Sequence, residues 1–229
     1  KRGEILGFAG LIGSGRTAVA EAIVGLTKKT NGSVTLKGQP ADFTDVSNSV
    51  AAGLAYMTKD RKGRGLLLNA GLTPNLTLLT LKKHLKNGFL DSSSETKALE
   101  RAVRRFDIRA RDPSVPVGKL SGGNQQKLML GKTMESEPDI VIMDEPTRGI
   151  DVGTKQQIYH IIAALAAEGK AIIVISSEMQ EVIGLSHRVV VMRQGRMAGM
   201  LEGAEITEAE IMRYAAGIKQ GGEDDRLSA

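Results

Sequence analysis

Residues 10–17 read Gly-Leu-Ile-Gly-Ser-Gly-Arg-Thr and follow a short apolar run at residues 4–9. Residues 17–25 then have helical composition and end on glycine. Such a loop between a strand and a helix points successive backbone N–H groups at phosphate oxygens, and the helix adds its positive N-terminal end. The segment fits the phosphate-loop pattern G-x-x-x-x-G-K-[ST], except that Arg16 replaces the lysine. The sequence therefore predicts a mononucleotide-binding unit, with a plain glycine-rich turn as the alternative.

The residues of this loop have separate expected roles. Thr17 would supply a hydroxyl to Mg²⁺. Arg16 is longer, planar and forked where lysine is a compact point charge, but it can still hold phosphate through two parallel hydrogen bonds. We therefore expect retained nucleotide binding and impaired chemistry. The expected phosphate contacts are Gly10, Gly13, Ser14, Gly15, Arg16 and Thr17.

Beyond the loop, the chain alternates between short apolar runs and helical patterns. Continuous apolar runs at residues 140–143 and 171–175 are typical of strands buried on both faces of a sheet. Helical patterns at residues 75–86 and 94–106 interrupt the alternation and predict a small helical insert. We therefore expect an α/β domain with a mostly parallel sheet. The other expected elements are strands at residues 33–37, 54–57, 188–192 and 197–201, a charged loop at residues 58–71, and helices at residues 45–52, 124–135, 151–167, 179–185 and 207–216.

The apolar run at residues 140–143 ends in two acids, Asp144 and Glu145. In nucleoside triphosphatases the first acid of such a pair binds Mg²⁺ through water, and the second polarises the attacking water. A strand end with two surface acids is the alternative. Asp151 follows closely in the sequence Gly-Ile-Asp.

The most specific motif is Leu-Ser-Gly-Gly-Asn-Gln-Gln-Lys at residues 120–127. Ser121 and the two glycines open the helix expected at residues 124–135, so their N–H groups would face outward as an anion site. An ordinary serine cap followed by a Gly-Gly turn is the alternative. The position of the motif shortly before the acidic strand end argues against that alternative.

Taken in order, the phosphate loop, the Leu-Ser-Gly-Gly motif, the acidic strand end and the Gly-Ile-Asp loop resemble the ATP-binding-cassette family over nearly the whole chain. The forms Leu-Ser-Gly-Gly-Asn-Gln-Gln-Lys and Asp-Glu-Pro-Thr-Arg-Gly-Ile-Asp-Val-Gly are similar to a narrower group. That group is the tandem ATP-binding subunits of bacterial carbohydrate importers of the ribose, xylose and galactose type. The similarity is to their second domain, in which Gly-Arg-Thr replaces Gly-Lys-Thr.

This resemblance implies a fold, two cofactors and a shared site. The fold is a phosphate-loop cassette with a helical signature subdomain, and we expect its first strands, which carry an adenine-stacking aromatic residue, to be missing here. The cofactors are ATP and Mg²⁺. In the family two cassettes pack head to tail, and each ATP lies between the phosphate loop of one and the signature of the other. Ser121, Gly122, Gly123 and Gln125 would then complete the ATP site of a partner cassette, and Asp151 would lie in the interface loop.

Three positions of the chain's own ATP site depart from the family pattern. Arg16 replaces the lysine of the phosphate loop, Lys59 aligns with a glutamine that ends a core strand, and Ser177 aligns with a histidine. The resemblance therefore implies an intact signature on a chain whose own phosphate site is degenerate. The expected catalytic positions are Glu145 and Ser177, the further nucleotide-binding position is Lys59, and the metal positions are Thr17 and Asp144.

The same pattern predicts the domain organisation. Residues 1–74 and 139–216 would form the two parts of the phosphate-loop core, residues 75–138 the helical subdomain with the signature helix, and residues 217–229 a flexible tail. The opening Lys-Arg-Gly-Glu-Ile-Leu is not a signal peptide and is typical of the middle of a hairpin that enters a strand. We therefore expect the chain to belong to a longer polypeptide.

Composition limits the classes of partner. Aromatic residues make up 3% of the chain and there is no Trp, which argues against base-stacking nucleic-acid modules. The absence of Cys excludes disulfides and thiolate chemistry, and the net charge of +5 is scattered. No apolar run is long enough to span a bilayer. The expected partners are a second cassette upstream in the same polypeptide, the membrane permease subunits and, indirectly, a periplasmic sugar-binding protein, at the cytoplasmic face of the bacterial inner membrane and without nucleic acid.

Two alternatives to a transport ATPase stay open. One is a regulatory domain that holds ATP without hydrolysing it. The other is a DNA-repair or translation cassette, which the signature variant and the short helical insert oppose. The histidines occupy none of the expected site positions and are interpreted as ordinary polar or surface residues; they are His84, His160 and His187.

Overall fold

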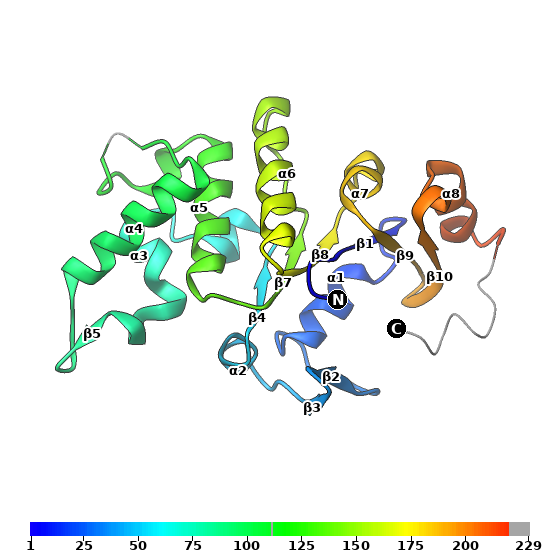
Figure 1. The fold of residues 1–229 in the computed structure, drawn as a ribbon, viewed down its shortest axis with the longest axis horizontal. Coiled ribbons are helices and arrows are strands. Elements are labelled where there is room, and N and C mark those ends of the chain that lie inside the picture. The colour runs from blue at the N-terminus through cyan, green and yellow to red at the C-terminus, as the bar shows by residue number, and fades with distance from the viewer. Residues whose placement is uncertain (111, 220–229) are drawn as a thin grey trace. The chain divides into compact units, whose positions relative to one another are not determined.

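The computed structural model describes residues 1–110 and 112–219 (Figure 1). Contacts within the chain divide it into two compact units. The core unit takes in residues 1–56, residues 139–145 and the chain from residue 162 onward, and the helical unit takes in residues 57–138 and 146–161. Compared with the helical region expected at residues 75–138, the helical unit also contains the segments on either side of the acidic strand end.

The core unit is built on a sheet with the strand order β10-β9-β1-β8-β7-β4. Strand β1 pairs in parallel with β8 and β9, and β7 pairs in parallel with β8, while β10 is antiparallel to β9. The sheet confirms the predicted α/β class with mostly parallel strands. The strands are β1 (Ile5–Gly10), β4 (Leu54–Met57), β7 (Ile140–Asp144), β8 (Ala171–Ile175), β9 (Arg188–Arg193) and β10 (Arg196–Glu202).

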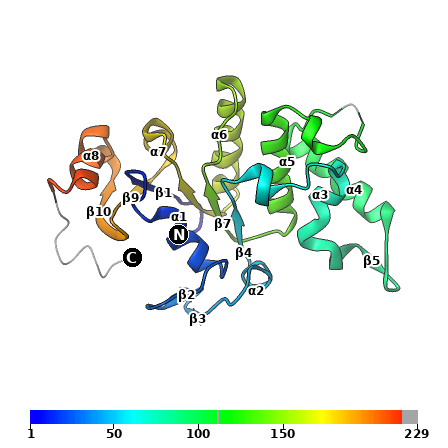
Figure 2. The ribbon, with the colours of Figure 1, turned by 180° about the vertical axis from the view of Figure 1, so that it is seen from behind.

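Apolar clusters cover the sheet on both faces (Figure 2). One cluster joins Ala20 and Val24, from the end of helix α1 (Arg16–Ile23), to strand residues such as Ile142. The other joins helices α7 (Met179–Leu185) and α8 (Glu208–Ala216) to strand residues such as Val191. Because neighbouring residues of a strand point to opposite faces, a continuous apolar run is what a sheet covered on both sides requires.

A short hairpin and two further helices complete the core unit and its border. Strand β2 (Val34–Leu36) pairs antiparallel with β3 (Gln39–Ala41), a strand that the sequence analysis missed. Helix α2 (Val46–Ala51) begins at Asp45, whose side chain accepts a hydrogen bond from Asn48 N. Helix α6 (Val152–Ala167) contributes residues to both units.

The helical unit contains helices α3 (Leu72–Thr77), α4 (Ser92–Phe106) and α5 (Gly122–Glu135). The helix predicted at residues 75–86 was wrong beyond Thr77. A 3₁₀ segment, η2 (Leu78–His84), follows with a kink at Thr80, and a hairpin of β5 (Leu85–Lys86) and β6 (Phe89–Leu90) comes next. Asn87 and Gly88 both have positive φ, as a tight hairpin turn requires, and this turn overrides the helical pattern.

The charged segment predicted as a loop at residues 58–71 contains a π-helical turn, η1 (Arg61–Gly65). Gly65 N donates to the carbonyl of Asp60 at 2.9 Å, and the Asp60 side chain accepts from Gly63 N at 2.9 Å. The loop prediction was wrong for these residues, because a single five-residue turn leaves no periodic pattern in a sequence. A second short 3₁₀ segment, η3 (Val117–Lys119), leads into α5.

The C-terminal part follows the prediction as far as the structure describes it. Thr207 Oγ1 accepts a hydrogen bond from Glu210 N at 3.3 Å, which confirms the helix start predicted from their spacing. Helix α8 ends at Gly217, and residues 220–229 of the expected tail lie outside the described residues. No helix within residues 1–110 and 112–219 is both long and apolar enough to cross a membrane.

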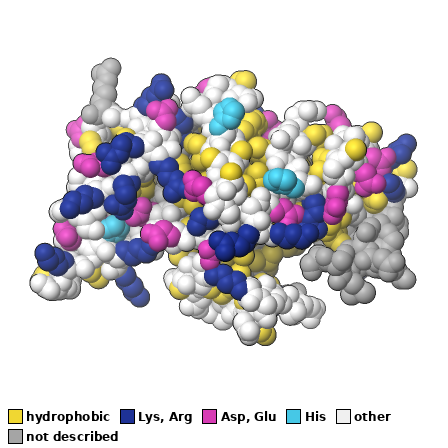
Figure 3. All heavy atoms as spheres, viewed as in Figure 1, with side chains coloured by type: hydrophobic (Ala, Val, Ile, Leu, Met, Phe, Trp, Pro, Cys, Tyr) yellow, Lys and Arg dark blue, Asp and Glu magenta, His cyan; other side chains and the backbone are white. Residues whose placement is uncertain are grey.

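Charged side chains of both signs are intermixed on the face shown in Figure 3. Most of the lysine and arginine side chains on this face have acidic side chains close by, and the helical unit follows the same pattern. This distribution agrees with the scattered charge expected from the sequence.

Candidate functional site

The phosphate loop between β1 and α1 lies close to the β9–β10 turn. A Cβ atom on Gly10 would collide with the carbonyl of Met192, and one on Gly15 would lie 2.9 Å from Gly195 Cα. Both glycines have positive φ, so a side chain is excluded on conformational as well as steric grounds. Gly195 N also donates to the carbonyl of Ser14 at 2.9 Å. The loop is therefore held in shape by backbone contacts alone.

Several features of this loop fit a bound phosphate. No side chain caps the first turn of α1, so its N–H groups are not satisfied by a cap. Ser14 Oγ is buried and has no hydrogen-bond partner within the described residues. Gly13 has positive φ and faces open space. A phosphate group would satisfy these donors, which is what a plain glycine-rich turn does not require.

Arg16 turns into the core unit. Its side chain is buried, with 8% of the residue exposed, and Nη1 donates to the carbonyl of Ser176 at the end of β8. Burial lowers the pKa of Arg16, while the charges of Glu145 and Asp144 raise it. The guanidinium is thus a buried cation held by the strand ends, and it is already engaged by the protein's own groups.

Asp144 at the end of β7 is completely buried, so the alternative of two surface acids was wrong for this residue. The Tyr56 hydroxyl donates to Asp144 Oδ2 at 3.0 Å. Asp144 Oδ1 is buried without a partner within the described residues. A buried carboxylate oxygen that lacks a donor fits a hard cation such as Mg²⁺, which takes one or two carboxylates together with phosphate oxygens and water. No cluster of three or more metal-ligating side chains occurs in the described part of the chain.

Glu145 adopts a left-handed backbone conformation with φ of 52°. Its N–H donates to the carbonyl of Ile175 at 2.7 Å, and Ser177 Oγ donates to its Oε2 at 2.9 Å. Such a conformation is uncommon for a residue other than glycine and recurs at functional sites. The ends of β7 and β8 therefore bring the two predicted catalytic positions together.

The signature residues form a separate group in the helical unit. Ser121 Oγ accepts hydrogen bonds from Asn124 N at 3.3 Å and from Asn124 Nδ2 at 3.0 Å, so it does cap α5. A Cβ atom on Gly123 would meet the Thr154 side chain at 2.6 Å. A Cβ atom on Gly122 would lie 3.2 Å from the carbonyl of Gly149. Glycine at both positions is thus explained by close packing at the helix start.

Asp151 caps the start of α6. Its carboxylate accepts from Thr154 N at 2.9 Å and from Thr154 Oγ1 at 2.8 Å. These two hydrogen bonds lower the pKa of Asp151. Because Thr154 also packs beside Gly123, Asp151 fixes a neighbour of the signature, and both belong to the helical unit.

Gln125 is almost completely buried, so its side chain is used inside the helical unit. Its Nε2 donates to the carbonyls of Val117 and Leu120, each at 3.1 Å, and its Oε1 accepts from Arg61 Nε at 3.1 Å. Arg61 was missed by the sequence analysis. The only signal for it was the pair of glutamines on α5, which are buried polar residues that require partners.

The remaining predicted positions are dispersed. Lys59 is exposed and lies shortly after β4 in the helical unit. His160 and His187 are exposed, and His187 Nδ1 accepts from Ile5 N at 3.0 Å. His84 is buried, which corrects its interpretation as a surface residue. Its Nδ1 lies 2.9 Å from Ser94 Oγ, so it belongs to the packing between η2 and α4.

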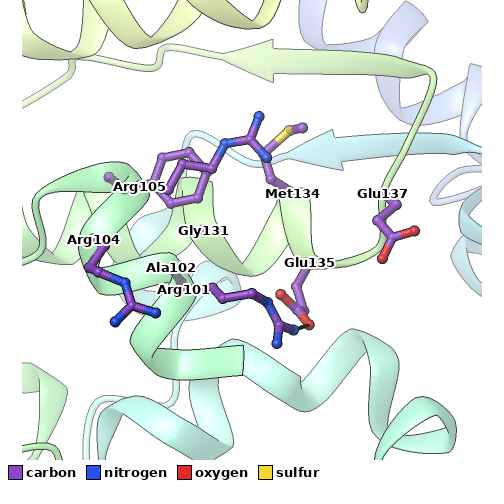
Figure 4. A pocket seen from close by; sticks show the side chains of 9 residues that line it. Arg101, Ala102, Arg104, Arg105, Gly131, Met134, Glu135 and Glu137 are labelled. Carbon is purple, nitrogen blue, oxygen red and sulfur yellow. Dashed lines mark hydrogen bonds and ion pairs between the residues drawn. The ribbon is translucent and has the colours of Figure 1, made fainter. Parts of the chain in front are cut away.

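A hollow of about 480 Å³ lies elsewhere in the helical unit, between α4 and α5 (Figure 4). Arg101, Arg104 and Arg105 line one side, and Glu135 and Glu137 lie at the other. Arg101 Nη2 contacts Glu135 Oε1 at 3.4 Å. The hollow shares no residue with the predicted nucleotide positions.

Comparisons with known proteins place this geometry in context. A family model described as ABC transporter matches residues 1–148. A ribose import ATP-binding protein of Agrobacterium fabrum is 43% identical over 217 residues, which cover 95% of this chain and 42% of the relative. One from Clostridium perfringens is 44% identical over 220 residues, which cover 95% and 44%. The chain thus spans less than half the length of these curated relatives.

Solved structures show the same fold at low identity. A nucleotide-free ATP-binding cassette from an ABC transporter aligns with a TM-score of 0.78 at 18% identity, over 99% of this chain and 88% of that one. A dimeric cassette in a post-hydrolysis state, bound to ADP and Pi, aligns with a TM-score of 0.75 at 20% identity, over 88% and 86%.

Proposed function

Since the chain belongs to the ABC transporter family, we propose that it is a nucleotide-binding domain of a carbohydrate importer. The phosphate loop at residues 10–17 binds ATP, and residues 121–123 complete an ATP site whose phosphate loop belongs to a second cassette. That cassette precedes this chain in the same polypeptide. The ribose import proteins among its relatives support a sugar as the cargo and make ribose the first sugar to test.

The observation that carries this proposal is the contrast between two helix starts. At α1, the Arg16 side chain is buried and donates to the carbonyl of Ser176. At α5, the Ser121 hydroxyl accepts from Asn124 N, and glycine follows it at the next two positions. The first helix start is occupied by the chain's own cation, whereas the second offers backbone donors to an outside anion.

In the chain's own site, Thr17 and Asp144 are the groups that would hold Mg²⁺ beside the phosphates. The metal would neutralise phosphate charge there. Glu145 would orient a water molecule, but its carboxylate accepts the Ser177 hydroxyl instead. We therefore propose that this site retains ATP and contributes little hydrolysis, while the partner site hydrolyses ATP.

The contact between Ser177 and Glu145 also favours a second candidate function. In that case the chain is a regulatory domain that binds ATP without turning it over. The two candidates are compatible in one transporter, because one site can work while the other stays occupied. They differ in whether blocking residues 121–123 stops transport.

The remaining partners follow from the importer proposal. Membrane permease subunits would receive the domain at the cytoplasmic face of the inner membrane. A periplasmic sugar-binding protein would deliver the cargo from the other side. Nucleic acid has no place in this proposal.

The test uses the full-length protein assembled with its permease and compares Gly122→Asp with Gly122→Ala. A Cβ atom at this position is tight, at 3.2 Å from the carbonyl of Gly149, so both variants share a steric effect. Only the aspartate sets a carboxylate against phosphate. Removing preorganised donors costs about a hundredfold in rate, so we expect Gly122→Asp to lower steady-state ATPase by about that factor and Gly122→Ala by clearly less.

Sugar uptake into vesicles provides the second readout. Loss of uptake in Gly122→Asp with normal assembly supports the importer proposal. Normal ATPase and uptake in Gly122→Asp would refute the role of residues 121–123.

A further inference from the structure

Arg61 is held at the start of α5 by three acceptors. Its Nε donates to Gln125 Oε1 at 3.1 Å, and its Nη1 donates to Gln126 Oε1 at 3.2 Å and to the carbonyl of Arg148 at 3.5 Å. Its Nη2 lies 3.3 Å from the place where a Cβ atom on Gly122 would stand. The guanidinium therefore lies directly beside the first residue of the helix.

The turn that carries Arg61 is itself fastened to α5. Lys132 Nζ donates to the carbonyl of Gly65 at 2.7 Å, and Lys132 is buried. Burial lowers the pKa of Lys132 and that of Arg61. Arg61 at the beginning of η1 and Gly65 at its end thus bond to the first and the last part of the same helix.

A cation at this place has a cost that requires a reason. The N-terminal end of a helix carries partial positive charge, so a guanidinium beside it is repelled. Partial burial adds a desolvation cost. The amide oxygens of Gln125 and Gln126 offset these costs only because they match the fork of an arginine, which lysine cannot reproduce.

We propose that Arg61 is a positioning residue for the signature, which holds the backbone at Gly122 and Gly123 in the geometry that receives phosphate. This inference rests on the proposed function of residues 121–123. Arg61 acts through Gln125 and Gln126 and does not itself contact substrate. Its charge also raises the positive potential that an incoming phosphate meets at this helix start.

The mechanism predicts which kinetic constant changes. Backbone donors stabilise a transition state only when they are correctly placed, and a small displacement costs up to about a hundredfold in rate. The ATP of the partner site is held mainly by the phosphate loop of that cassette. Loss of Arg61 therefore lowers kcat while KM for ATP stays almost unchanged.

The experiment compares Arg61→Ala and Arg61→Lys in the full-length protein assembled with its permease. We expect kcat to fall about tenfold in both variants, with KM changed less than about twofold. Lys62→Ala is the matched control, because it removes an exposed cation from the same turn. Its kcat should equal that of the wild type. Arg61→Lys with wild-type kcat would overturn the positioning role, since it would show that charge alone is sufficient.

A coupling measurement separates positioning from loss of stability. Gln126→Leu removes one acceptor of Arg61, so the double variant with Arg61→Ala should be no slower than Arg61→Ala alone. Additive losses in kcat, or a fall in kcat that follows the melting temperature across the variants, would also overturn the proposal.

Gly122→Asp, measured in parallel, distinguishes the two possible failures. If Gly122→Asp abolishes ATPase and the Arg61 variants do not change it, the positioning role is wrong and the proposed function stands. If Gly122→Asp has no effect, the proposed function itself is wrong.

Discussion

The Ser177 hydroxyl donates a hydrogen bond to Oε2 of Glu145 at 2.9 Å. The two residues follow the ends of neighbouring parallel strands, β8 and β7, so their proximity is set by the sheet register. A carboxylate that orients water must offer a free oxygen to it, and here one of the two oxygens already has a donor from the same chain. A histidine at position 177, as in the family pattern, would be long enough to reach further into the site.

The first prediction concerns these two residues. Glu145→Gln should lower the ATPase rate of the assembled transporter less than about threefold, because the working site is proposed to belong to the other cassette. Ser177→Ala should change the rate even less, since it only frees a carboxylate. Steady-state phosphate release measures both. Complete loss of ATPase in Glu145→Gln would show that hydrolysis takes place on this chain's own phosphate loop.

The second prediction concerns Arg16. Arg16→Ala should weaken nucleotide binding to this domain about tenfold or more, because a charge-assisted contact to phosphate is lost. Arg16→Lys should keep binding and should not double the ATPase rate, because Lys59 and Ser177 remain altered. Titration with a fluorescent ATP analogue, with the partner cassette blocked, measures binding. A doubled rate from Arg16→Lys alone would contradict the asymmetry between the sites.

How far the sequence predicts this structure depends on how local each signal is. The run at residues 140–143 predicts a buried strand because its apolar side chains fill both faces of the sheet. Asp144 and Ser177 come together because parallel strands end at one edge of the sheet. Both relationships follow from periodicity and topology, which sequence patterns record.

Other features lacked such a signal or were overridden. The Asn87-Gly88 turn was visible, but the leucines and lysines before it favoured a helix. The inward direction of Arg16 depends on a carbonyl at Ser176, which is distant in the sequence. Arg61 depends on glutamines beyond the whole helical insert. Contacts between residues so far apart leave no mark in a single sequence.

The third prediction concerns Asn75, a fully buried residue in α3. Its Oδ1 accepts from Leu67 N at 2.7 Å, and its Nδ2 donates to the carbonyls of Leu67 at 3.0 Å and Gly71 at 2.8 Å. Asn75→Ala leaves these backbone groups without partners and should destabilise the helical unit by about 3 kcal/mol. Asn48→Ala, at an exposed side chain, is the control. Urea unfolding followed by circular dichroism measures both, and equal midpoints would contradict the prediction.

The last prediction concerns Glu4 and Arg188, which join the beginnings of β1 and β9 through an Nε–Oε1 contact of 2.5 Å. Burial alone would raise the pKa of Glu4, but the hydrogen bonds from Arg188 and from the chain's first amino group lower it from 4.5 to about 2. A depressed pKa in the folded state stabilises the fold at pH values above 4.5. This contribution is lost as the pH falls from 4.5 through about 2.

The full shift corresponds to about 3 kcal/mol at 1.36 kcal/mol per pKa unit, and solvent screening reduces the expected contribution to about 2 kcal/mol. Glu4→Gln should therefore flatten the fall in the free energy of unfolding between pH 5 and pH 2 by about this amount. Glu202→Gln is the control, because Glu202 is 3.9 Å from the same arginine and largely exposed. Unfolding free energies measured across this pH range decide the matter: parallel curves for wild type and Glu4→Gln would show that the pair does not stabilise the sheet, because both groups would then keep their ordinary titration on folding.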